Sequence, residues 1–200
     1  VNNIDLPITK PLLPLFESVV NSIDAVGEKG GRLGNIGVEI IREDKQEDYI
    51  DKVHSNPVAG FKVSDDGVGF DSENYKSFCT SDSPYKARKG CKGIGRFLWL
   101  KSFQSVHVSS AFEEGGRFYK REFDFCLSEG GVENEELVEL SEVGAVSTQV
   151  VLEGYKPHYQ KHCPKKATTI AQKIIEHCLS FFLSGVCPKI TLYDCGESIN

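Results

Sequence analysis

The chain has 200 residues, of which 40% are hydrophobic and 26% charged, so it can bury one substantial core and we expect a single domain over 1–200. The formal net charge of -6 argues against duplex nucleic acid as the main ligand, because a phosphate backbone requires a basic face. Nothing in the composition points to disorder, collagen or a membrane span, and we expect no membrane partner.

The cysteines and the two chain ends give a further expectation about context. The seven cysteines are odd in number and form no Cys-x-x-Cys pair, and no secretory signal opens the chain, which predicts reduced thiols and a cytoplasmic location. The chain starts at Val1 rather than methionine and stops in a polar run. We therefore expect it to be part of a longer protein, with downstream domains as partners.

The first strong pattern is helical. Apolar residues recur at helical spacing between 11 and 28, while Glu17, Asn21, Asp24 and Glu28 form one polar stripe on the opposite side. Glu17 and Asn21 are one turn apart, so a carboxylate that can accept a proton from water stands beside an amide oxygen that can complete a magnesium shell. The alternative is an ordinary surface helix with a polar outer face.

Further elements follow in chain order. Residues 71–92 are polar and irregular and too long for an ordinary connection, so we predict a mobile lid there. Apolar periodicity predicts the remaining helices and strands: strands at 37–41 and 61–64, a helix at 94–103, strands at 105–109, 117–125 and 146–152, a helix at 168–183 and a strand at 189–193. This order predicts an α+β fold with a mixed sheet and the helices on one face.

An acidic turn, Asp65-Asp66-Gly67-Val68-Gly69, follows the second strand. Its glycines allow a positive φ and a close backbone approach. An ionised carboxylate only accepts hydrogen bonds, so Asp65 at the floor of a cavity would suit the amino group of adenine and reject the carbonyl of guanine. The alternative is a plain loop between strands.

A glycine run, Gly90, Gly93 and Gly95, precedes the apolar helix. Backbone N–H groups in such a turn can bind phosphate, and Lys92 and Arg96 would add positive charge. The run is not a P-loop, because Arg96 stands where that motif requires lysine. The alternative is a flexible linker.

Taken together, the three segments resemble the GHKL superfamily, named for gyrase B, the heat-shock chaperones of the ninety-kilodalton class, histidine kinases and MutL. The helix matches the N-box of that family, in which Glu17 corresponds to the general base, Asn21 to the magnesium ligand and Asp24 to a second polar wall residue. The residues that match the other family elements are Asp65, Gly67 and Gly69 of the adenine box, Gly90, Gly93 and Gly95 of the phosphate lip, and Thr148 beside the adenine. We expect Lys92, Ile94 and Arg96, which lie in or beside this lip, to contribute to nucleotide binding as well.

The resemblance, which looks like the chaperone or MORC-like branch, implies the Bergerat ATP-binding fold, a two-layer α/β sandwich with a mainly antiparallel sheet. It implies magnesium-dependent ATP binding and slow hydrolysis, with water activated by Glu17 and with lid closure coupling the nucleotide state to partner domains or to a nucleotide-dependent homodimer. Relatives often supply a lysine or arginine from a following domain, and no residue here matches it.

Three alternatives remain open. The first is a histidine-kinase-type phosphotransferase domain, and the second is a module that binds ATP without turnover and acts as a switch. The third is a zinc site built from His158, His162 and Cys163, whose side chains are of the types that zinc prefers.

Overall fold

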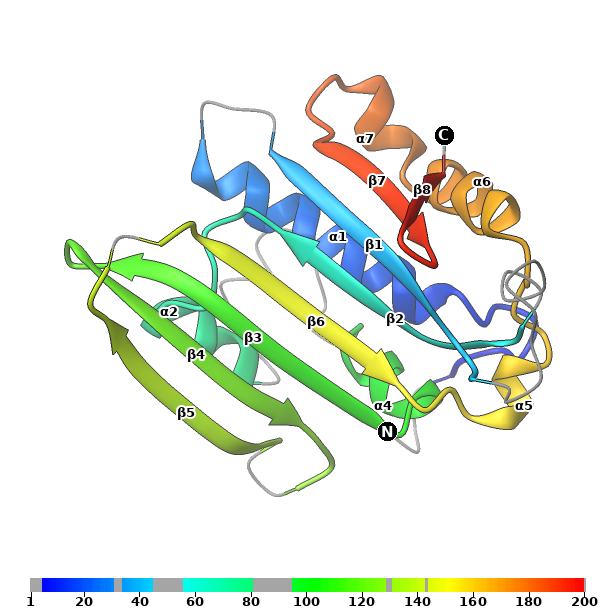
Figure 1. The fold of residues 1–200 in the computed structure, drawn as a ribbon, viewed down its shortest axis with the longest axis horizontal. Coiled ribbons are helices and arrows are strands. Elements are labelled where there is room, and N and C mark those ends of the chain that lie inside the picture. Colours follow the sequence, from blue (N-terminus) through cyan, green and yellow to red (C-terminus); the bar gives the residue numbers. More distant parts are fainter. Residues whose placement is uncertain are drawn as a thin grey trace.

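The computed structural model describes residues 5–30, 34–44, 56–80, 95–128, 131–142 and 144–199. Within these ranges the chain forms one open eight-stranded sheet, mixed but mainly antiparallel, together with six helices (Figure 1). The predicted α+β class and mixed sheet are therefore confirmed.

Helices and strands are interspersed along the chain. The helices are α1 (Leu13–Lys29), α2 (Ser72–Cys79), α4 (Phe97–Ser102), α5 (Pro157–Gln160), α6 (Ala167–His177) and α7 (Leu179–Leu183). The strands are β1 (Asn35–Arg42), β2 (Val58–Asp65), β3 (Ser105–Glu114), β4 (Arg117–Phe125), β5 (Val132–Leu140), β6 (Ser147–Glu153), β7 (Lys189–Asp194) and β8 (Glu197–Ile199).

The strand order is β5-β4-β3-β6-β2-β1-β7-β8, in which β1 and β7 pair in parallel and the other neighbours pair antiparallel. Register then decides which side chains meet. Thr148 on β6 is paired with Asp65 on β2 and with Ser110 on β3. The pairing therefore brings three polar side chains from distant parts of the sequence to one end of the sheet.

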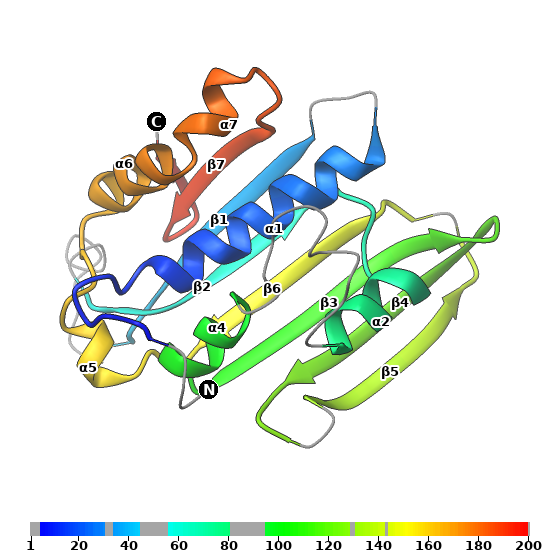
Figure 2. The same ribbon diagram turned by 180° about the vertical axis from the view of Figure 1, so that it is seen from behind.

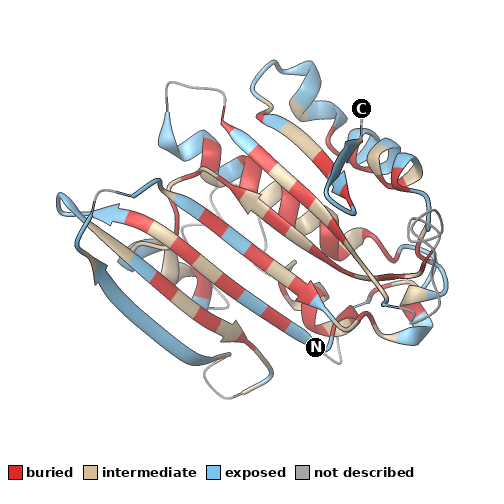
Figure 3. Cartoon of the chain, in the orientation of Figure 1, coloured by how far each residue is buried: buried red, intermediate tan, exposed pale blue. Residues whose placement is uncertain are grey.

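Helices α1, α2, α4, α6 and α7 all lie on one face of the sheet, and the other face carries none of the described helices (Figure 2). The central strands show the result, because buried residues alternate along them with intermediate or exposed ones (Figure 3). On β3, for example, Val106 and Val108 are buried, whereas His107 between them is exposed. The core lies between the helices and the inner face of the sheet.

Helix α1 forms because its apolar residues share one face and its ends are defined. Pro14 occupies the first turn, where a missing N–H costs nothing, and Gly30 ends the helix with a φ of 70°. Leu15, Val19 and Ile23 are almost completely buried against the sheet. Burial of each such side chain contributes about 2 kcal/mol to the free energy of folding. The helix predicted for 11–28 is confirmed.

Part of the segment predicted to be an irregular lid is instead a packed helix. Asp71 caps α2 by accepting a hydrogen bond of 2.7 Å from the backbone N–H of Asn74, and Phe78 is buried against the rings of Phe123 and Trp99. The expectation of irregular structure was therefore wrong for 72–79. Residues 81–92 of the predicted lid lie outside the described residues.

Other predictions were wrong in detail. Strand β5 was missed because its sequence is rich in glutamate and does not alternate, and its residues are mostly exposed. The helix predicted for 168–183 is divided into α6 and α7 at Cys178, which has a φ of -90° and a ψ of 10°. Helices α2 and α5 and the short strand β8 were not predicted either. The common cause is weak apolar periodicity in short segments.

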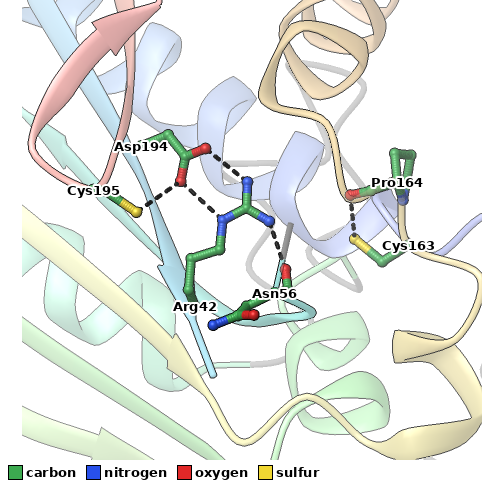
Figure 4. A network of polar contacts seen from close by, with 6 residues as sticks. All are labelled: Arg42, Asn56, Cys163, Pro164, Asp194 and Cys195. Carbon is green, nitrogen blue, oxygen red and sulfur yellow. Dashed lines mark hydrogen bonds and ion pairs between the residues drawn. The ribbon is translucent and has the colours of Figure 1, made fainter. Parts of the chain in front are cut away.

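A buried ion pair joins β1 to β7 (Figure 4). Arg42 donates to both carboxylate oxygens of Asp194, through Nε at 2.9 Å and Nη2 at 2.7 Å, and through Nη1 to the backbone oxygen of Asn56 at 2.7 Å. The two charged side chains are only 4% and 2% exposed. The guanidinium of Arg42 therefore links the parallel strand pair through three hydrogen bonds, two of them to the carboxylate of Asp194.

Candidate functional site

A cavity lies between α1 and the inner face of the sheet. Its lining combines apolar side chains, including Trp99 and Val150, with several polar ones. Five residues predicted from the sequence line it: Asn21, Asp24, Asp65, Gly69 and Thr148. The fold thus brings the first helix, the acidic turn and the late threonine together around one space.

Asp65 is the most buried carboxylate of this cavity, with 7% of its surface exposed. Its Oδ2 accepts a hydrogen bond of 2.7 Å from the Ser22 hydroxyl, and its Oδ1 accepts one of 3.0 Å from the backbone N–H of Gly67. Burial raises the pKa of Asp65 to about 6, against the lowering effect of these two donors. At neutral pH the cavity therefore contains an ionised acceptor with lone pairs to spare.

The neighbouring Asp66 has a structural role. Its side chain accepts hydrogen bonds from the backbone N–H and the side-chain amide of Asn35, at 2.8 and 3.0 Å. The Lys29 ammonium donates to the backbone oxygen of Asp66 at 2.6 Å. Asp66 thus connects the turn to the start of β1 and the end of α1, while Asp65 faces the cavity.

The two glycines of the acidic turn are explained by close packing. A Cβ on Gly67 would lie 2.7 Å from the backbone carbon of Ala25, so the turn lies directly on α1. Gly69 has a φ of +80°, and a Cβ there would lie 2.8 Å from the Cβ of Phe112. The turn can approach α1 and β3 this closely only because both positions lack side chains.

A chain of hydroxyl groups supports the other wall. The Ser110 and Thr148 hydroxyls are 2.9 Å apart and share a hydrogen bond, and the Ser110 hydroxyl also accepts from the backbone N–H of Phe70 at 3.0 Å. Ser110 is fully buried and Thr148 is 5% exposed. The Thr148 hydroxyl is therefore held in place where it lines the cavity.

Sequence reasoning missed Ser22 and Ser110. Ser22 follows Asn21 on α1, and its small hydroxyl gave no signal because serine is common in solvated helices. Ser110 could have been found only from the strand register, which pairs it with Thr148.

Glu17 lies beside Gly95, the last glycine of the predicted phosphate lip. A Cβ on Gly95 would overlap with the Glu17 carboxylate, so the two residues are in direct contact across 78 positions of sequence. Glu17 is half-buried. The remaining lip residues, Lys92, Gly93 and Ile94, lie outside the described residues.

Arg96, predicted to add charge to the lip, lies elsewhere. It is 5% exposed, and its guanidinium carbon lies 4.9 Å from the ring centre of Phe78 and 5.2 Å from that of Phe97. It lines a second cavity rather than the one that contains Asp65.

The side chains that line the cavity with Asp65 include one oxygen ligand of the kind that magnesium binds. Asn21 lines the cavity and has a neutral amide oxygen. Magnesium usually takes only one or two ligands from the protein and keeps water and phosphate oxygens as the others, so this one oxygen fits the ion. Within the part of the chain that the structure describes, no three His, Cys, Asp or Glu side chains form a group that could hold a metal ion. The zinc alternative at His158, His162 and Cys163 therefore has no support.

The chain was compared with known proteins. No protein-family model matches it, and no curated protein matches it either. Among the described helices, none combines the length and the apolar character needed to cross a bilayer. The class that the structure defines is thus an α+β protein with one open mixed sheet and a polar-floored cavity under its first helix.

Proposed function

We propose that this chain is a GHKL-type ATPase domain with the Bergerat fold, which binds magnesium ATP and hydrolyses it slowly. The observation that carries the proposal is the buried Asp65 carboxylate, held by Ser22 and Gly67 at the floor of a cavity that Asn21 and Thr148 also line. Residues of the first helix, the acidic turn and β6, which are far apart in the sequence, thus line one cavity, and this supports the proposal.

Adenine recognition is assigned to Asp65. With one lone pair used by Ser22 and one by Gly67, the ionised carboxylate can still accept from an exocyclic amino group. The carbonyl that guanine has at this position would face a negative charge and could donate nothing. Thr148, held by Ser110, supplies a hydroxyl beside the same space.

Magnesium would be held by the amide oxygen of Asn21, with Asp24 as a second polar group on the same wall. The ion would offset negative charge on the phosphate oxygens. Glu17, one turn earlier on α1, would accept a proton from the attacking water. Its contact with Gly95 restricts where its carboxylate can lie, and such positioning is the main requirement of phosphoryl transfer.

Replacement of Glu17 tests the hydrolytic part of the proposal. Glu17→Ala should retain ATP binding and reduce phosphate release by a factor of about 100 or more, since general base catalysis contributes on that order. Glu176→Ala on α6 removes an exposed glutamate from another helix and should change neither. If the Glu17 variant releases phosphate at the wild-type rate, Glu17 is not the base.

The same assay separates the two rival functions. A phosphotransferase would leave acid-labile phosphate on protein after incubation with γ-labelled ATP, whereas an ATPase releases free phosphate. A module that only binds would show saturable ATP binding with neither product. Lid closure and a nucleotide-dependent homodimer belong to the proposal, and solution scattering with and without ATP would detect the dimer. Coupling of the nucleotide state to partner domains is part of the proposal and rests on the family resemblance.

A further inference from the structure

Helix α7 is apolar in sequence, yet it lies on the surface. It consists of Leu179-Ser-Phe-Phe-Leu183, and none of these five residues is buried. Leu179, Phe182 and Leu183 are 49%, 39% and 79% exposed, and Figure 3 shows most of α7 in the colour of exposed residues. Large apolar side chains are normally removed from water, so an exposed cluster of them marks an interaction surface.

The exposed apolar residues extend beyond α7 in both directions. Ile175 on α6 and Val186, just after α7, are 52% and 65% exposed. The backbone also keeps helical hydrogen bonds across the junction at Cys178. The N–H of Cys178 donates to the oxygen of Ile174 at 2.9 Å, and the N–H of Phe182 donates to the oxygen of Cys178 at 3.2 Å. The spacing of a helix therefore applies on both sides of the junction.

This spacing places the exposed residues on one side of the helical segment. Ile175, Leu179 and Phe182 are separated by four and then three residues, which is the spacing of one helix face. Ile170 and Ile174, on the other side, are buried in the core. The segment is therefore apolar on an inner and an outer face. We call the outer one the α6–α7 face, which consists of Ile175, Leu179, Phe182, Leu183 and Val186.

The sequence that forms most of the α6–α7 face lacks acidic residues, although the chain is acidic overall. The formal net charge is -6, yet neither Asp nor Glu occurs between Glu176 and Asp194. Two copies of the chain repel each other through their net charge, but here they can meet without opposing carboxylates. Hydrophobic contact has no direction, so such a face complements an identical one across a twofold axis.

The exposed area is sufficient for a contact between two copies. At about 200 Å² for one large side chain, the exposed fractions leave about 500 Å² on each copy. Two copies with the polar residues around this face would therefore bury about 1,000 Å² in total, the least expected of a specific interface. Helices α6 and α7 lie beside β7 and β8 at one edge of the sheet, where a second copy can approach them (Figures 1 and 2).

We propose that two copies of this chain associate about a twofold axis through the α6–α7 face. The proposal does not depend on the proposed ATPase activity, because the residues of this face are not among the described residues that line the Asp65 cavity. The dimer should therefore form without nucleotide, unlike the nucleotide-dependent homodimer that belongs to the proposed function.

Sedimentation equilibrium without nucleotide, at protein concentrations from about 1 μM to 1 mM, tests the proposal. The mass should rise from 22.2 kDa and level off at twice that value. Leu183→Glu and Ile175→Glu each bring two like charges into a twofold contact and should weaken the dimer at least about tenfold. Both residues are more than half exposed, so both variants should fold, which urea unfolding checks.

Leu127→Glu is the matched control. Leu127 is 68% exposed and follows β4, outside the α6–α7 face, so the same substitution there should leave the dimer unchanged. A wild-type mass of one chain at every concentration would overturn the proposal, as would a mass that passes two chains without levelling off. A dimer that survives both glutamate variants, or that forms only with ATP, overturns it as well. ATP binding is measured on the same samples, and its failure would remove the proposed function while leaving the oligomeric state as measured.

Discussion

The Ser22 hydroxyl donates a hydrogen bond of 2.7 Å to the Asp65 carboxylate, which joins α1 to the end of β2 at the floor of the cavity. The two residues are 43 positions apart. Because the carboxylate is both buried and needed as an acceptor, its ionisation has opposite consequences for stability and for ligand binding.

Asp65→Asn should stabilise the fold at neutral pH while weakening adenine binding. The pKa of Asp65 is raised from 3.8 to about 6, so the folded protein holds this proton more tightly than the unfolded chain, and stability falls as pH rises from about 4 through 6. The loss above pH 6 corresponds to about 3 kcal/mol, which the variant would not incur. Urea unfolding between pH 4.5 and 8 measures it.

We expect the difference in unfolding free energy between Asp65→Asn and the wild type to grow as the pH rises. Ser22→Ala is the informative companion, because loss of this donor leaves the carboxylate charge less compensated and should cost about 1–3 kcal/mol at pH 8. A wild-type protein whose stability rises through this pH window, with no gain for Asp65→Asn, would contradict the raised pKa.

Gly95→Ala should impair hydrolysis without removing nucleotide binding. A Cβ at this position would overlap with the Glu17 carboxylate, which must then move away from its place. A displaced general base should reduce phosphate release at least about tenfold, and a coupled phosphate assay measures this. The matched change is Gly27→Ala on α1, where nothing lies within 4 Å of the new methyl group.

The control variant, Gly27→Ala, should leave hydrolysis unchanged. Gly27 lies inside a helix, so alanine there should add up to about 1 kcal/mol of stability. If Gly95→Ala behaves like Gly27→Ala in the phosphate assay, the contact between Gly95 and Glu17 has no bearing on turnover.

Asp194→Ala should destabilise the fold severely. The change leaves Arg42 buried without its carboxylate, and breaking a buried pair in this way costs about 3–5 kcal/mol. Glu139→Ala is the comparison, since its partner Arg117 is exposed and such surface pairs contribute less than about 1 kcal/mol. Urea unfolding of the two variants at pH 7 should give clearly different midpoints, and equal midpoints would show that burial adds nothing here.

Much of the fold could be predicted from the sequence because its periodic elements are strong. The apolar stripe of α1 and the alternation of β4 each specify one structure, and β4 was predicted with its observed bounds. Strand β5 could not be found this way, because its pairing with β4 rather than its own composition makes it a strand. Helix α2 was hidden by polar residues around its one buried anchor, Phe78.

The sequence predicts only those site residues that belong to a recognisable motif. Asn21 and Asp65 could be identified from their residue types and spacing, and Thr148 from the family resemblance. The fold brings all three to one cavity. The supporting hydroxyls of Ser22 and Ser110 depend on tertiary distance. The direction of Arg96, over two rings and into another cavity, also depends on packing that no local pattern encodes.

Calorimetric titration of ATP in the presence of magnesium, with GTP as the matched ligand, tests the Asp65 cavity most directly. The predicted result is saturable binding of ATP but not GTP, weakened at least about tenfold by Asp65→Asn and unaffected by Asp44→Asn at an exposed site. Equal affinity for ATP and GTP, or no binding of either by the folded wild-type chain, would contradict adenine recognition by Asp65.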